Sequence, residues 1–120
     1  MGLSKPVEHG DVTITGVTVN EDSTTMNFEG TVGKYGSVFV TQTLHALDGD
    51  KSRGRLEGNA RVILDDGTLL WSPVTGTFRS ERSTGKISFL DCVSNGDQNF
   101  VIWDVDMLGK TAKVRVYSLL

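Results

Sequence analysis

Apolar and polar residues alternate along almost the whole chain, which is the period of a half-buried β-strand and not of a helix. Eight such runs cover residues 12–19, 26–32, 38–46, 56–64, 69–78, 85–93, 98–107 and 110–118. The alternation changes phase at Gly16, which predicts a β-bulge, and a second phase change is expected at Pro73. The pattern therefore predicts an all-β chain of eight strands.

Short turn signals separate these runs, and Asp66-Gly67 and Asn95-Gly96 are the dipeptides that most favour tight hairpins. Eight strands joined in this way form an antiparallel meander, and eight strands can close into a barrel that is filled by side chains or holds one small ligand. A two-sheet sandwich is the alternative, but its crossing connections are usually longer. We expect a closed eight-stranded antiparallel up-and-down barrel, one domain over residues 1–120 with residues 1–9 as a loose N-terminal segment.

Two tight turns predict how the last three strands pair. A two-residue turn at Asn95-Gly96 places Ser88 opposite Trp103, and a two-residue turn at Leu108-Gly109 places Trp103 opposite Val114. One face of these strands then carries almost no charge and is expected to line the barrel. Its members are Leu90, Cys92, Val101, Trp103, Val105, Ala112, Val114 and Val116.

This apolar interior fits a ligand site, since such sites are mostly apolar and concave with few polar groups. Gly58 and Ala60 are small and are expected to leave space inside. Trp103 is expected near the centre of the barrel, with Ser88 as the hydrogen-bond partner of its indole N–H. The residues predicted to contact a ligand in the lumen are Trp71, Ser88, Leu90, Trp103, Val114 and Val116.

The opposite face mixes large apolar groups with charges, which is typical of a subunit interface with a polar rim. Asp91, Asp104 and Asp106 lie on this outer face in the predicted register, although a one-residue slip would turn them inward. We expect a homo-oligomer, most simply a dimer, and scattered surface apolar residues are the alternative. The predicted interface residues are Phe89, Phe100, Ile102 and Tyr117.

Composition supports the all-β prediction and argues against nucleic acid and membranes as partners. The chain has 14 Val and 13 Thr against 3 Ala, and β-branched residues favour strands. Its net charge of −3 and isoelectric point of about 5.2 give no basic field for nucleic acid or anionic membrane. No apolar run approaches the roughly 20 residues that span a bilayer, and no secretory signal is visible. The expected location is cytoplasmic.

Catalytic and metal-binding patterns are absent from the sequence. His9, His45 and Cys92 are too few and too scattered for a zinc site. A lone His in a strand is usually a surface residue, and Cys92 is expected to be buried and unreactive. The basic residues around Arg53 are expected to form a solvated strand face. We expect no cofactor, no metal and no catalytic residues.

Several short motifs resemble the allene-oxide-cyclase-like barrel superfamily, in particular its small bacterial members. They are Tyr35-Gly36-x-Val38, Gly54-x-x-x-Gly58-x-Ala60, Asp66-Gly67-Thr68, Gly76-Thr77-Phe78, Trp103-x-Val105-Asp106 and Val114-x-Val116-Tyr117. The resemblance covers about residues 26–118 and implies an eight-stranded antiparallel barrel, often oligomeric, with an apolar lumen. Plant relatives include cyclases and dirigent proteins that hold a reactive lipid or radical in that lumen.

Three functions remain open from the sequence. The first is a binding module that holds a small apolar or amphipathic molecule in the lumen, and the second is a cyclase or isomerase that uses the lumen as a template. The third is a structural or interaction protein with a filled core. The enzyme hypothesis requires an inward ionisable group with a perturbed pKa, which the predicted registers do not supply.

Overall fold

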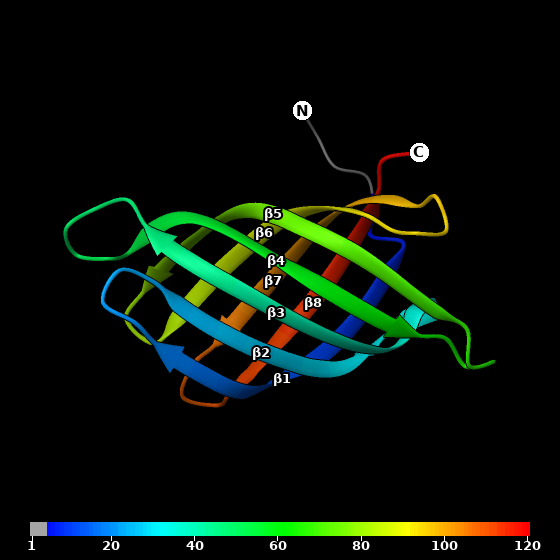
Figure 1. Ribbon diagram of the computed structural model, residues 1–120, viewed down its shortest axis with the longest axis horizontal. Helices are drawn as coiled ribbons and strands as arrows, with labels where there is room; N and C mark the ends of the chain where they lie inside the picture. The colour runs from blue at the N-terminus through cyan, green and yellow to red at the C-terminus, as the bar shows by residue number, and fades with distance from the viewer. Residues whose placement is uncertain (1–4) are drawn as a thin grey trace.

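Residues 5–120, which the computed structural model describes, form a closed barrel of eight antiparallel strands (Figure 1). Each strand pairs with its neighbour in sequence, and the first strand pairs with the last to close the barrel. The strands are β1 (Glu8–Val19), β2 (Thr24–Val32), β3 (Gly36–Ala46), β4 (Arg53–Ile63), β5 (Leu69–Glu81), β6 (Thr84–Cys92), β7 (Gln98–Asp106) and β8 (Thr111–Ser118). A single 3-10 turn, η1 (Gly33–Tyr35), joins β2 to β3. The predicted fold is confirmed.

The N-terminal part is more ordered than the sequence suggests, because β1 begins at Glu8 and Glu8 pairs with Val116. The Val7 N–H also donates to the Val116 carbonyl over 2.7 Å. The prediction of a loose segment is therefore wrong for residues 7–9, and residues 1–4 lie outside the described part of the chain. The bulge predicted at Gly16 is confirmed by a register shift between Ile14 and Gly16.

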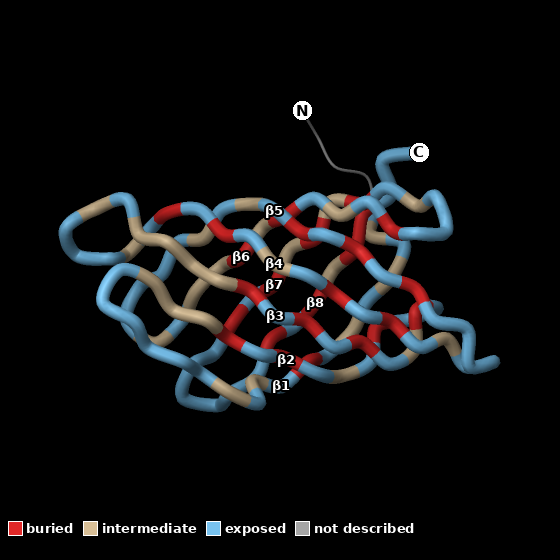
Figure 2. Tube along the Cα trace, viewed as in Figure 1, coloured by how far each residue is buried: buried red, intermediate tan, exposed pale blue. Residues whose placement is uncertain are grey.

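Inward-facing residues alternate with exposed ones along every strand, and buried positions line the inside of the barrel (Figure 2). Trp103 belongs to this core, with an exposed fraction of 2%. Phe28 and Phe89 pack edge-on against it, at ring-centroid distances of 4.7 and 5.5 Å. Edge-to-face packing of this kind adds about 0.5–1.5 kcal/mol per pair beyond the burial of apolar area.

Gly58 in β4 marks a close approach of neighbouring strands. A Cβ at Gly58 would overlap the Thr41 carbonyl oxygen of β3, so no side chain fits there. The small inward residue expected to leave room for a ligand is instead covered by backbone.

The β6–β7 turn differs from the prediction by one residue. The Val93 N–H donates to the Asp97 carbonyl over 2.8 Å, which leaves a three-residue loop over residues 94–96. Gly96 has a φ of 100°, whereas Asn95 is not among the positive-φ residues. A three-residue loop ending in a left-handed Gly is the common alternative to the two-residue type I′ turn, and it shifts the pairing by one.

This slip reverses the faces of β6. Phe89 lies opposite Val101 and is 4% exposed, so it lines the interior and cannot belong to an outer interface. Leu90 is 51% exposed and Cys92 is also exposed, contrary to the prediction for both. The β7–β8 register is as predicted, with Trp103 opposite Val114.

Strand β5 also differs from the expectation, because no phase change occurs at Pro73. The pairing with β4 runs without a break along the strand, which places Trp71 opposite Arg61 on the outer face. Trp71 is 58% exposed, and the smaller Leu70 points inward in its place. An aromatic side chain was therefore a poor guide to which face is buried.

Candidate lumen site

A cavity of about 50 Å³ lies inside the barrel, at the end where β2 finishes and β3 begins. Most of its lining is apolar, including Trp103, Val114 and Val116 as predicted. Asp91, Ser72 and Tyr35 bring polar groups to the same cavity. The lumen is thus apolar through most of its depth and polar toward one end.

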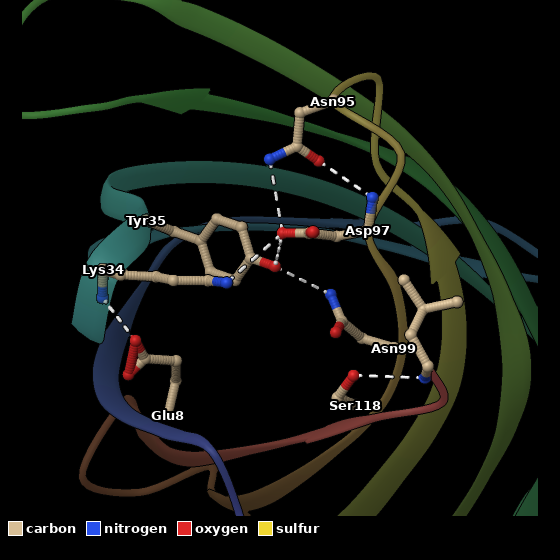
Figure 3. Close-up of polar contacts among 8 residues, drawn as sticks. Glu8, Lys34, Tyr35, Asn95, Asp97, Asn99 and Ser118 are labelled. Carbon is tan, nitrogen blue, oxygen red and sulfur yellow. Dashed lines mark hydrogen bonds and ion pairs between the residues drawn. The ribbon is translucent and has the colours of Figure 1, made fainter.

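Tyr35 closes this end of the barrel. Gly33 and Gly36, with φ values of 45° and 72°, flank the 3-10 turn that carries it. The Tyr35 hydroxyl donates to Asp97 Oδ2 over 2.7 Å and accepts from Asn99 Nδ2 over 3.0 Å. Figure 3 shows its ring reaching from η1 toward the loop that carries Asp97.

Lys34 and Glu8 make further polar contacts beside the Tyr35–Asp97 hydrogen bond. Lys34 Nζ lies 3.5 Å from Asp97 Oδ2, and the Lys34 backbone N–H donates to Glu8 Oε1 over 3.0 Å (Figure 3). Burial raises the pKa of the Tyr35 hydroxyl, and its hydrogen bond to Asp97 raises it further. The same hydrogen bond lowers the pKa of Asp97. The Tyr35 hydroxyl therefore stays protonated and donates its hydrogen to Asp97.

Asp91 brings a carboxyl group to the cavity inside the barrel. The one-residue slip of β6 turns its side chain inward, between Val74 of β5 and Asn99 of β7. Burial raises its pKa to about 6, although hydrogen bonds from Asn99 oppose this effect. Its Oδ1 is shielded from solvent and has no hydrogen-bond partner among residues 5–120.

Gln42 is a second inward polar residue without a partner. It has an exposed fraction of 0%, and within the described part of the chain neither its Nε2 nor its Oε1 makes a hydrogen bond. The pairing of four neighbouring strands connects it to Asp91 in one row, since Gln42 pairs with Gly58, Gly58 with Val74, and Val74 with Asp91. Most buried polar groups in proteins are hydrogen-bonded, so two such groups in one row require an explanation.

Three of the six predicted ligand-contact residues do not reach the lumen. Trp71 and Leu90 are exposed, and Ser88 lies opposite Ile102 on the outer side, away from the Trp103 indole. Sequence reasoning missed Tyr35 and Asn99 as site residues. Asn99 alternates in phase with Val101 and Trp103, so its inward position could have been predicted, whereas Tyr35 appeared only in a turn motif. Gln42 alternates in phase with the inward Val38 and Val40 of its predicted strand, so its burial could also have been predicted.

The predicted outer interface is also changed. Phe100 and Ile102 are half-buried on the outer face, and Tyr117 is 7% exposed. Leu90, Phe100 and Tyr117 are paired across three strands and form one apolar strip. Leu90 takes the place predicted for Phe89.

No protein-family model, no curated protein and no solved structure matches this chain. Within residues 5–120, no helix has both the length and the apolar character needed to cross a membrane.

Proposed function

We propose that the barrel binds a small apolar or amphipathic molecule in its lumen, with the polar part of the molecule at the Asp91 end. The observation that carries this proposal is an apolar cavity whose one carboxyl group, that of Asp91, has a shielded oxygen without a partner in the described chain. Binding pockets usually combine an apolar lining with a few convergent polar groups. The resemblance to allene-oxide-cyclase-like barrels fits this proposal.

The size of the cavity limits how binding occurs. Its volume of about 50 Å³ holds one or two water molecules at roughly 30 Å³ each. Typical small-molecule pockets are about 300–1,000 Å³. A ligand larger than a few atoms therefore has to displace Tyr35, whose ring covers the cavity. Rotation of this side chain breaks two hydrogen bonds and opens the end of the barrel.

Trp103 fluorescence tests lumen binding. The chain has 2 Trp residues, and Trp71→Phe removes the exposed one, so the remaining signal comes from inside the barrel. Titration with a small hydrophobic probe should shift Trp103 emission, and Tyr35→Ala in the same background should strengthen the response by enlarging the cavity. An unchanged spectrum in both variants would refute the proposal and favour a filled-core structural protein.

A second candidate function is acid–base catalysis on a molecule held in the lumen, of the cyclase or isomerase kind. Asp91 favours it, because a buried carboxyl with a pKa of about 6 can exchange a proton near neutral pH. Turnover that disappears in Asp91→Asn while binding persists would distinguish catalysis from binding alone.

We also propose a homodimer joined through the apolar strip of Leu90, Phe100 and Tyr117. Support comes from the exposed fraction of 51% at Leu90, beside the half-buried Phe100 and the more deeply buried Tyr117. Arg115 and Asp104, 3.0 Å apart on the same face, supply a polar rim.

A further inference from the structure

We infer that the molecule bound in the lumen is a small amine, whose protonated nitrogen binds the Asp91 carboxylate. This inference rests on the proposed lumen binding and adds the chemical class of the ligand. It stands on the position of Asp91 in the cavity, on its unpartnered oxygen and on the charges and aromatic rings around it.

The first step is the missing partner of Asp91. An ionised carboxylate only accepts hydrogen bonds, so the group that satisfies Asp91 Oδ1 must be a donor. Asn99 lies directly across the β6–β7 pairing, and its Nδ2 donates to the Tyr35 hydroxyl over 3.0 Å. The Tyr35 hydroxyl donates to Asp97 instead, over 2.7 Å. Among residues 5–120 no other donor reaches Asp91 Oδ1, so the cavity leaves this position to water or to a ligand donor that displaces it.

The second step is the sign of the charge. Among residues 5–120, no Lys, Arg or His forms an ion pair with Asp91, and none lines the cavity. Lys34, next to Tyr35 in the chain, pairs with Asp97 over 3.5 Å. Asp97 itself adds negative charge near Asp91 and raises its pKa. A buried carboxylate without a counter-ion is costly, and a cationic ligand would offset that cost.

The third step is the remainder of the lining. Aromatic rings of Tyr35, Phe89 and Trp103 surround the cavity, and ring faces attract cations more than they attract anions. Gln42 lies on the same row, three strands from Asp91, and does not line the cavity. It therefore takes no part in binding the amine.

Binding by this mechanism depends on pH. The groups that face Asp91 are Asp97 in the loop, Tyr35 on η1 and Asn99 on β7, and only Asp91 changes charge near neutral pH. Because the amine requires the ionised carboxylate, its affinity should rise about tenfold for each pH unit below the pKa of about 6 and level off above it.

The test uses the full chain carrying Trp71→Phe, titrated at pH 8 with three molecules of the same branched skeleton: isobutylamine, isobutanol and isobutyrate. Trp103 fluorescence and a thermal shift report binding. The amine should bind at least 10-fold more tightly than the alcohol, and isobutyrate should not bind. Asp91→Asn should bring the amine to the affinity of the alcohol, and Asp104→Asn, on the outer face, is the matched control that should leave the preference intact.

Failure of the inference and failure of lumen binding give different results. Equal affinity for amine and alcohol, or a preference that survives Asp91→Asn, would overturn the amine assignment and leave lumen binding standing. If none of the three binds, even when Tyr35→Ala enlarges the cavity, both proposals are overturned.

Discussion

Replacing Asp91 by Asn should stabilise the protein at neutral pH and not at acidic pH. Burial raises the Asp91 pKa from its ordinary value of 3.8 to about 6. One pKa unit corresponds to about 1.36 kcal/mol, so ionising the buried group costs about 3 kcal/mol. Because the folded state holds the proton more tightly, the free energy of unfolding falls as pH rises from about 4 to about 6.

Asn has nearly the same shape as Asp and carries no charge, so the variant escapes this cost. Urea unfolding at pH 4.0 and pH 7.5 measures the effect, and the advantage of Asp91→Asn should grow by about 2 kcal/mol between these conditions. With an m-value of about 2 kcal/mol/M, that gain moves the midpoint by about 1 M.

Asp97→Asn is the matched control, because the pKa of Asp97 is lowered by the hydrogen bond from Tyr35. A lowered pKa stabilises the fold above the ordinary value and loses this contribution as pH falls, so this variant should be destabilised most at pH 7.5. A stability difference for Asp91→Asn that is the same at both pH values would refute the reasoning.

Three further changes test the core, the barrel wall and the assembly. Gln42→Met keeps an unbranched side chain and removes an unpartnered amide, so it should raise the free energy of unfolding by about 1–3 kcal/mol in urea titrations. Gly58→Ala should cost at least about 3 kcal/mol, since its Cβ would overlap backbone, whereas Gly49→Ala, with open space around it, should change stability by less than about 1 kcal/mol. Phe100→Asp should convert a dimer into a monomer in sedimentation at micromolar concentration without changing the circular dichroism, and a wild-type protein that sediments only as a monomer would contradict the proposed dimer.

The sequence could predict the barrel because the strand period persists through every element and the short turns favour pairing between consecutive strands over the longer crossings of a sandwich. It also predicted the bulge at Gly16 and the pairing of Trp103 with Val114. It could not fix the β6–β7 register, because Asn95-Gly96 fits either a two-residue turn or the end of a three-residue loop. One residue in that turn decides whether Asp91 faces solvent or the lumen.

The candidate site could not be predicted from the sequence for a related physical reason. Tyr35 and Asn99 meet Asp97 only because the barrel closes and brings η1 against the β6–β7 loop, and the hydrogen bond between Tyr35 and Asn99 joins residues 64 positions apart. Local patterns carry no information about such contacts. Gln42 was visible as a polar residue at an inward position, and only the structure shows that no described residue satisfies it.

The two places where this regular barrel breaks the rules of a stable core are Gln42 and Asp91. Other buried polar groups, such as Ser72, Asn99 and the Tyr35 hydroxyl, have hydrogen-bond partners. A hydrophobic residue in place of Gln42 or Asp91 would be compatible with the strand pattern and more stable. Under the lumen-binding proposal, Asp91 is kept because its Oδ1 accepts from a small polar-ended molecule held behind Tyr35. Gln42 lies on the same row but outside the lining of this cavity, so a molecule bound at Asp91 does not account for it.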